Sequence, residues 1–307
     1  METKDLVIIG GGPAGLTAGL YGARAALNTV LIEQGLPGGQ ASTTDRIDNY
    51  PGFPQGISGP DLMMQMDEQA RRFGLALEFA QVKQIVPGED KFILHTDGGE
   101  LAAKAVIIAT GAVSKALGVP GEQEFLGRGV SYCATCDGAF FQGKKVAVLG
   151  GGDSALQEGI FLTKFAEKVY IIHRRDELRA TRVLQAKVEK NEKLEFILNA
   201  TVSSILGTDK VEAVKIRDVS TQEEKSVAVD GVFVYIGKKP ANDLIKDLVR
   251  VDENGYILVN QQMMTSVPGI FAAGDVRQTP LRQVVTAVGD GAIAAVAAEQ
   301  FIESRHD

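Results

Sequence analysis

Cys133 and Cys136 are the residues whose type and spacing most directly suggest chemistry. They are the two cysteines of the 307-residue chain, and Asp137 and Gly138 follow them directly. Two sulfur ligands cannot close a structural zinc site without help from histidines or carboxylates. The nearest histidine in the sequence is His173, so no metal site is predicted. The spacing predicts a redox-active pair; a structural disulfide and two buried free thiols are the alternatives.

A glycine-rich segment near the N-terminus has the pattern of a dinucleotide-binding turn. The apolar run 6–9 predicts a strand, residues 16–27 have helical character, and a second strand over 30–33 ends in Glu33. In this pattern the first glycine permits a tight turn, the second lets the backbone approach a pyrophosphate, and the third lets helix and strand pack closely. Glu33 can accept hydrogen bonds from ribose hydroxyls. The motif consists of Gly10, Gly11, Gly12, Pro13, Ala14 and Gly15.

The same pattern recurs in the middle of the chain, between strands expected at 145–149 and 169–172. Glu33 stands 23 residues after Gly10, and the same offset from Gly150 falls on His173. The acid that would bind ribose is therefore absent from the second site. The second motif consists of Gly150, Gly151, Gly152, Asp153, Ser154 and Ala155.

Arginines follow His173 where the first site has its acid. Arg174, Arg175 and Arg179 can bind a 2′-phosphate through charge-assisted hydrogen bonds, whereas an acid would repel it. The second site is therefore predicted to prefer NADPH to NADH. The alternative is that the stretch from Arg174 to Arg182 is a solvated basic helix face. One acid-ended and one arginine-ended motif suggest two dinucleotides, and the pair suited to electron transfer is FAD and NADPH.

Three further apolar strands, each ending in a small turn, indicate how the chain is divided: residues 105–111, 231–237 and 269–275. The first closes an N-terminal unit, the second closes an inserted unit, and the third lies beyond the insert. Asp275, at the end of the third, could bind a ribityl hydroxyl or a phosphate-linked group. We therefore predict an α/β protein with two Rossmann-like dinucleotide-binding domains. The expected boundaries are 1–113 and 243–307 for a discontinuous FAD-binding domain and 114–242 for an inserted NADPH-binding domain.

The cysteine pair lies just upstream of the second glycine motif, inside the predicted NADPH-binding domain. Cys136, beside Asp137, is predicted to exchange electrons with the flavin, and Cys133 is predicted to attack a partner disulfide. Attack requires a thiolate and the leaving sulfur requires a proton, so Asp137 is predicted to be the acid–base group. Because NADPH and the cysteines must both reach one flavin from one domain, we expect that domain to rotate on its two linkers.

From end to end, the chain resembles the bacterial-type low-molecular-weight thioredoxin reductases. The resemblance implies a homodimer with one FAD per subunit, NADPH as electron donor and oxidised thioredoxin, or a thioredoxin-like dithiol protein, as acceptor. It is carried by both glycine motifs, the cysteine segment 133–138, the arginine cluster, and the segments 38–40, 48–52, 109–111, 274–275 and 282–283.

The resemblance also implies roles for individual residues. Besides the first motif and Glu33, the expected FAD-binding residues are Gln40, Asn49, Ala109, Thr110, Gly111, Gly274, Asp275, Arg282 and Gln283. Besides the second motif, the expected NADPH-binding residues are His173, Arg174, Arg175, Arg179, Ile236 and Gly237. Arg282 and Gln283 open an apolar helix expected over 284–302, whose positive end could stabilise charge on a reduced flavin; simple capping by polar residues is the alternative.

Net charge and the distribution of apolar residues restrict the possible binding partners and the cellular location. The net charge of −7 argues against general nucleic-acid binding, which requires a basic face. Residues 1–4 are short and mixed in charge, and a strand pattern begins at once, so no signal peptide is expected. The most apolar stretch, 284–302, contains Asp290 and Glu299, which favours a buried helix over a membrane span. We therefore predict a cytoplasmic protein.

Several related functions conflict with features of the sequence. Relatives that take electrons from ferredoxin or reduced flavin tend to lack the arginine cluster or the cysteine pair, and both are present. Hydroperoxide-linked relatives carry an additional N-terminal thioredoxin-like module, whereas this chain begins at the first predicted strand. A non-catalytic redox sensor that signals through Cys133 and Cys136, and an oxidase that passes electrons to O₂, remain as alternatives of a different class.

Overall fold

The computed structural model describes residues 3–305, which fall into two compact units. Unit 1 comprises Met1–Val113 and Lys239–Asp307, and unit 2 comprises Ser114–Lys238. The second boundary lies four residues before the position that the sequence analysis assigned to it. The chain passes between the units in two short strands, β7 (Ala112–Ser114) and β16 (Lys238–Pro240), which pair with each other.

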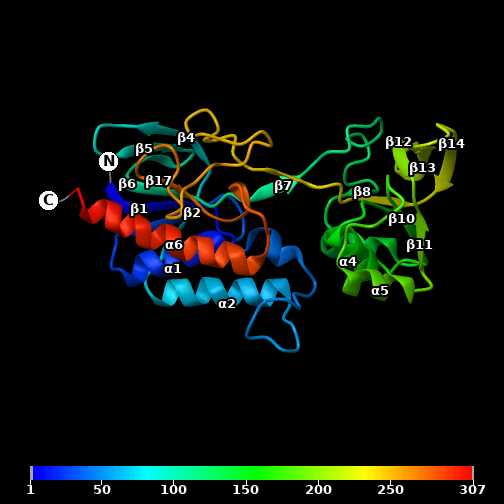
Figure 1. The fold of residues 1–307 in the computed structure, drawn as a ribbon, viewed down its shortest axis with the longest axis horizontal. Coiled ribbons are helices and arrows are strands. Elements are labelled where there is room, and N and C mark those ends of the chain that lie inside the picture. Colours follow the sequence, from blue (N-terminus) through cyan, green and yellow to red (C-terminus); the bar gives the residue numbers. More distant parts are fainter. Residues whose placement is uncertain (1–2, 306–307) are drawn as a thin grey trace. The chain divides into compact units, whose positions relative to one another are not determined.

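Within the described residues, unit 1 is built on a seven-stranded sheet (Figure 1). Its parallel part has the order β3-β2-β1-β6-β17, and an antiparallel hairpin of β4 and β5 pairs with the first half of β6. The strands are β1 (Thr3–Ile9), β2 (Thr29–Glu33), β3 (Ala76–Phe79), β4 (Val82–Pro87), β5 (Phe92–Thr96), β6 (Gly99–Ile108) and β17 (Ile270–Ala272).

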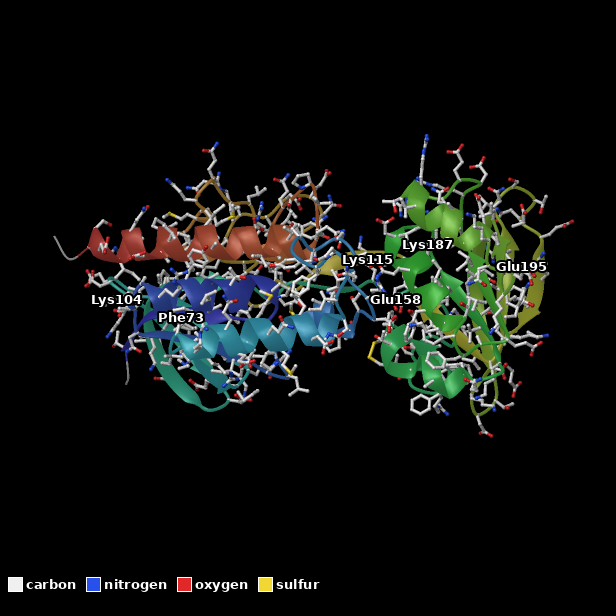
Figure 2. All side chains as sticks on the ribbon, turned by 90° about the horizontal axis from the view of Figure 1, so that it is seen from below. Phe73, Lys104, Lys115, Glu158, Lys187 and Glu195 are labelled. Carbon is white, nitrogen blue, oxygen red and sulfur yellow. A yellow bond between two sulfur atoms is a disulfide. The ribbon has the colours of Figure 1, made fainter. Side chains whose placement is uncertain are left out.

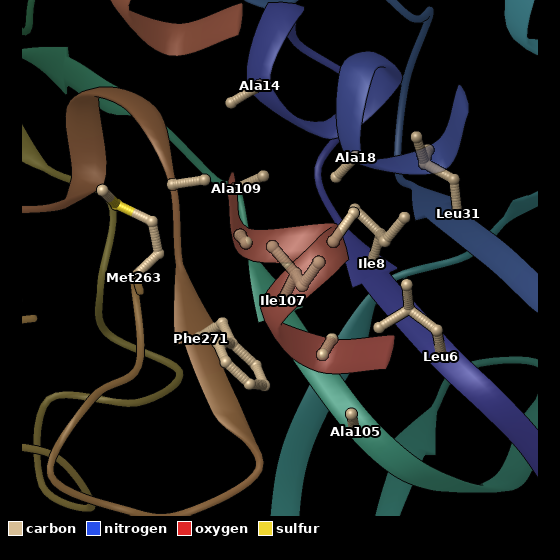
Figure 3. Close-up of a cluster of buried hydrophobic side chains, with 14 of the residues drawn as sticks. Leu6, Ile8, Ala14, Ala18, Leu31, Ala105, Ile107, Ala109, Met263 and Phe271 are labelled. Atoms are coloured by element: carbon tan, nitrogen blue, oxygen red, sulfur yellow. The ribbon is translucent and has the colours of Figure 1, made fainter. Parts of the chain in front are cut away.

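Alternate residues of the central strands supply two cores, one on each face of the unit 1 sheet. Leu6 and Ile8 pack toward α1 (Pro13–Arg24) and α6 (Val284–Glu303), together with Ile107 and Phe271 (Figure 3). Val7 and Ile9 pack on the other face with residues 245–257. A strand covered on both faces reads as a continuous apolar run, which explains why residues 6–9 show no polar alternation.

Three helices cover the first of these faces: α1, α6 and α2 (Gly59–Arg72) lie along one another (Figures 1 and 2). By length and composition α6 is the one described helix apolar enough to cross a membrane. In unit 1 it is a core helix instead, since its small residues pack on α1 and its Asp290 is buried in an ion pair. The helix expected at 284–302 is confirmed, with one side buried and with Val285, Ile293 and Val296 exposed.

Unit 2, whose residues 114–238 are all described, contains a five-stranded parallel sheet of order β11-β10-β9-β15-β8. Charged side chains such as Lys187 and Glu195 project from its exterior (Figure 2). The strands are β8 (Val130–Ser131), β9 (Lys145–Leu149), β10 (Lys168–Ile172), β11 (Leu194–Ile197) and β15 (Gly231–Val234), with helices α3 (Ala134–Asp137), α4 (Asp153–Leu162) and α5 (Arg182–Glu189). An antiparallel sheet of β12 (Ala200–Gly207), β13 (Val211–Asp218) and β14 (Glu224–Ala228) adds a second layer.

The two parallel sheets share one plan, with a difference in the origin of the fifth strand. In unit 1 the fifth strand, β17, comes from near the C-terminus. In unit 2 the fifth strand, β8, precedes β9, the strand that leads into the second glycine turn. Carboxyl ends of parallel strands lie at one edge of a sheet, where ligands bind in folds of this kind. In unit 2, β8 therefore delivers the cysteine segment to the edge where β9 delivers the second glycine turn. The α/β class with two Rossmann-like folds is confirmed.

Candidate active site

The first glycine turn joins β1 to α1 and leaves the start of the helix open. Gly10 lies at φ +105° and donates its N–H to the Ile32 carbonyl at 2.9 Å. A Cβ on Gly15 would lie 1.8 Å from the Gly10 carbonyl oxygen, so only glycine allows helix and strand to approach this closely. A Cβ on Gly12, the residue before Pro13, would meet nothing within 4 Å. This open space, faced by free helix N–H groups, fits a pyrophosphate.

Glu33 ends β2 directly against this turn. One carboxylate oxygen accepts the N–H of Gly11 at 2.7 Å, and the other accepts the N–H of Gly35 at 2.9 Å. Each carboxylate oxygen has a second lone pair, so the side chain can still accept a ribose hydroxyl. Glu33 is therefore held in the position that the sequence pattern assigns to the ribose-binding acid.

A buried ion pair holds the turn that follows β17. The Arg277 guanidinium forms two contacts with the Asp290 carboxylate, with Nε to Oδ2 at 2.7 Å, and the N–H of Gly274 donates to the same Oδ2 at 3.0 Å. Asp275, next to Gly274, lies in this turn. The sequence analysis did not assign Arg277 or Asp290 to the site. The available signal was an acidic residue in the middle of an apolar stretch, because a buried acid requires a partner.

Residues expected at the FAD site are brought together from distant parts of unit 1. Asn49 donates its side-chain N–H to the Gln283 side chain at 2.9 Å across 234 residues. Gln283 also caps α6 reciprocally with Thr286, so the capping role is confirmed. The Arg282 guanidinium lies 3.9 Å from the centre of the Tyr256 ring, a stacking contact. Among the described residues, its Nε is buried without a hydrogen-bond partner, which fits a polar ligand.

The remaining residues expected there line the same edge of the sheet. Gln40 donates to the Ala112 carbonyl, and the Thr110 hydroxyl donates to the Ala241 carbonyl at 2.6 Å. Ala109, the residue after β6, is buried against the first glycine turn, and Gly111 lies at φ +69°.

The second glycine turn joins β9 to α4 in the same way. A Cβ on Gly152, the N-cap of α4, would meet nothing within 4 Å, whereas a Cβ on Gly151 would lie 2.6 Å from the His173 ring. In the first turn the corresponding neighbour of Gly11 is Glu33. The offset of 23 residues therefore places His173 and Glu33 in equivalent positions. Ser154 and Ala155 form the first turn of α4, with Ala155 buried against Gly150.

His173 itself carries little charge at neutral pH. Burial lowers the pKa of His173, and the positive charges of Arg179, Arg175 and Arg174 lower it further, against a hydrogen bond to the Glu177 backbone. The side chain is 5% exposed, and within the described chain its Nε2 has no hydrogen-bond partner. A neutral ring with a free nitrogen offers a hydrogen bond to a nucleotide but not a countercharge.

We call residues 173–181, between β10 and α5, the arginine loop. Arg174, Arg175 and Arg179 are exposed on it, and no carboxylate of the described residues pairs with their guanidinium groups. The N–H groups of Arg179 and Ala180 both donate to the Gly151 carbonyl, at 2.7 and 3.1 Å. The loop is thus bonded to the glycine turn, and its arginines are available to an anion such as a 2′-phosphate.

Cys133 and Cys136 form a disulfide where β8 enters α3. Cys133 is the N-cap, and its Sγ accepts the N–H of Cys136 at 3.2 Å; Cys136 is exposed, whereas Cys133 is partly buried. Asp137 is the last residue of α3. The predicted redox pair is therefore an oxidised, accessible disulfide, and the alternative of two free thiols is wrong.

Two tyrosines beside the disulfide were not assigned to the site from the sequence. The Tyr235 hydroxyl accepts the N–H of Ala134 at 2.8 Å, and Tyr132 donates to the carboxylate of Glu122 at 2.5 Å. Glu122 is 2% exposed and also accepts backbone N–H groups of Leu117 and Gly118. Burial raises the pKa of each tyrosine, with neighbouring acids adding to the effect. Ile236 and Gly237, expected at the nucleotide site, are exposed just after Tyr235.

Two dinucleotide turns and a redox-active disulfide in one chain define a nucleotide-dependent disulfide oxidoreductase. The family model for pyridine nucleotide-disulphide oxidoreductases matches residues 4–291. The thioredoxin reductase of Bacillus subtilis is 50% identical over 300 residues, which cover 97% of this chain and 95% of the relative. The chain therefore belongs to the pyridine nucleotide-disulphide oxidoreductase family and, within it, to the thioredoxin reductases.

Solved structures agree with this membership. The thioredoxin reductase of Lactococcus lactis in its FR conformation superposes with a TM-score of 0.96 at 45% identity, covering 98% of this chain and 99% of that one. The thioredoxin reductase of Streptococcus pyogenes gives a TM-score of 0.66 at 49% identity, covering 98% and 99%. Members of this family are FAD flavoproteins that use NADPH, and the two glycine turns fit those two nucleotides.

Proposed function

We propose that this chain is an NADPH-dependent thioredoxin-disulfide reductase. The observation that carries the proposal is the disulfide of Cys133 and Cys136 at the carboxyl edge of the sheet that also carries the second glycine turn and the arginine loop. FAD, when bound, would supply the two-electron chemistry that connects NADPH with this disulfide. The relatives named above are thioredoxin reductases, which supports thioredoxin as the acceptor.

We assign FAD to unit 1 and NADPH to unit 2. The acid at the first turn and the arginines at the second support this division, because an acid repels a 2′-phosphate and arginines bind it. In unit 1, Glu33, Asn49, Asp275, Arg282 and Gln283 would hold FAD around the first glycine turn. In unit 2, Ser154, His173, Arg174, Arg175 and Arg179 would hold NADPH around the second.

The hydrogen bonds at α3 support different roles for the two sulfurs. The N–H of Cys136 already points at the Cys133 Sγ and would stabilise a thiolate there after reduction. That thiolate would attack a disulfide of the partner, forming a mixed disulfide and releasing the partner's first sulfur as a thiol. Cys136 would then attack Cys133, which re-forms the internal disulfide and releases the second partner thiol. Asp137 would give and take the protons of these steps.

Rotation of unit 2 on its two linkers would let NADPH and the disulfide use one flavin in turn. Cross-linking the two units in one orientation should abolish turnover while one half-reaction survives. Full turnover in the cross-linked protein would contradict rotation. A homodimer and a cytoplasmic location complete the proposal.

The decisive experiment is NADPH oxidation with purified thioredoxin, comparing the wild type with Cys136→Ser. We expect the variant to lose thioredoxin reduction, because a single sulfur cannot form the internal disulfide, while NADPH still bleaches the flavin. Reduction of thioredoxin by the variant would overturn the roles of the sulfurs. Wild-type protein that binds both nucleotides but never turns over with thioredoxin or another disulfide would favour the redox sensor instead.

A further inference from the structure

We propose that Asp153 determines the preference for NADPH over NADH without touching the nucleotide, by holding the arginine loop against the second glycine turn. The proposal rests on the proposed function, because it assumes that NADPH binds to unit 2. The second glycine motif predicts that Asp153 contacts the nucleotide. The structure gives its carboxylate a different partner: Oδ1 accepts the N–H of Thr181, the last residue of the arginine loop, at 2.6 Å.

Three consecutive residues at the end of the arginine loop are bonded to the glycine turn. The N–H groups of Arg179 and Ala180 donate to the Gly151 carbonyl, and that of Thr181 donates to Asp153. Only the last of these bonds uses a side chain, so Asp153 is the residue of the turn whose identity decides how firmly the loop is held. Arg179 lies two residues before Thr181, so the Asp153 bond adds to the two backbone bonds that hold this segment against the turn.

The charge of Asp153 is unfavourable for phosphate binding at this position. It is the first residue of α4, beside the open space that fits a pyrophosphate, and a carboxylate there repels phosphate. A role through charge and a role through the Thr181 bond therefore predict opposite signs. If charge dominates, removing the acid strengthens binding of the 2′-phosphate. If the bond dominates, removing the acid releases the arginine loop and weakens that binding.

Two fragments of the nucleotide separate these cases in the holoenzyme. Adenosine 2′,5′-bisphosphate carries the 2′-phosphate, whereas 5′-AMP lacks it, and isothermal titration measures the affinity of each without turnover. We expect Asp153→Ala to weaken the bisphosphate by roughly tenfold, the size of one lost charge-assisted hydrogen bond, and not to weaken 5′-AMP. Asp153→Asn keeps an oxygen that can accept the Thr181 N–H, and should weaken neither probe.

A second variant removes the same bond from its other side. Thr181 has φ −59° and makes no side-chain cap, so its φ angle suits proline, which has no N–H to donate. Thr181→Pro should lose bisphosphate affinity as Asp153→Ala does. The matched control is Asp176→Ala, which removes an exposed acid of the same loop and should not weaken the bisphosphate. In steady state, KM for NADPH should rise in both bond variants while kcat stays near that of the wild type.

The outcomes distinguish this proposal from the one on which it rests. If Asp153→Ala keeps or strengthens bisphosphate binding, or if Asp153→Asn falls as far as Asp153→Ala, the role of the Thr181 bond is overturned. A wild-type chain that binds the two probes equally would overturn the assignment of NADPH to unit 2 together with this inference.

Discussion

The hydroxyl of Tyr235 accepts a hydrogen bond from the backbone amide of Ala134, 101 residues earlier in the chain. Ala134 is fully buried and is the first residue of α3, where a helix leaves its N–H groups without partners. Tyr235 also donates its own N–H to the Leu149 carbonyl at the end of β9. One residue therefore connects the redox helix to the strand that leads into the second glycine turn.

Replacing Tyr235 with phenylalanine should loosen the redox helix. The buried N–H of Ala134 would lose its acceptor, which costs about 1–3 kcal/mol of unfolding free energy, and disulfide exchange should slow more than flavin reduction by NADPH. Urea unfolding and rapid-mixing kinetics measure the two effects. Tyr170→Phe, on a partly buried tyrosine of β10, is the control and should change neither. Equal slowing of both half-reactions would contradict a role specific to α3.

Replacing Asp290 with alanine should release FAD. The change leaves the Arg277 guanidinium, 16% exposed, without its countercharge, at a cost of about 3 kcal/mol, and it removes the acceptor that holds the Gly274 turn. We expect lower unfolding free energy and a lower ratio of flavin to protein absorbance after gel filtration. Glu303→Ala, at an exposed position of the same helix, should retain full flavin. Full flavin content in Asp290→Ala would show that the turn holds without the ion pair.

Replacing Arg174 and Arg175 together with alanine should weaken NADPH far more than NADH. Each lost phosphate contact costs roughly 1.5–3 kcal/mol, and NADH has no 2′-phosphate to lose. Arg182→Ala, on the exposed start of α5, tests the alternative of a solvated basic face and should have little effect. The measurement is kcat/KM for each nucleotide, and equal losses for both would contradict the 2′-phosphate assignment.

The buried ring of His173 should make unit 2 less stable in mild acid. The pKa of His173 is lowered in the folded protein, chiefly by burial. Below about pH 6.5, the His173 ring therefore binds a proton more readily in the unfolded chain than in the folded chain. Unfolding free energy should therefore fall as the pH decreases from 7 to 5. His173→Gln should flatten this fall, whereas His95→Gln, on a partly exposed histidine of unit 1, should retain it. An unchanged slope in His173→Gln would contradict the lowered pKa.

The glycine turns were predictable because their constraints are local. Each glycine of the first turn meets a requirement within one short segment: a tight turn at Gly10, open space at Gly12 and a close approach at Gly15. The offset of 23 residues to Glu33 or His173 follows from the length of one strand–helix–strand unit. The equivalence of Glu33 and His173 holds in the structure for that reason. The cysteine pair was equally predictable, since its chemistry depends on two neighbouring side chains.

The sequence by itself thus determined the class of fold, the two nucleotide turns and the redox pair, because each depends on residues close together in the chain. The tertiary structure decided which distant residues support them: Asn49 with Gln283, Arg277 with Asp290, and Tyr235 with Ala134. It also decided that Asp153 accepts a hydrogen bond from the end of the arginine loop. These pairings depend on how strands are ordered and packed in a sheet, and no local pattern of residues encodes a hydrogen bond between segments that meet only after folding.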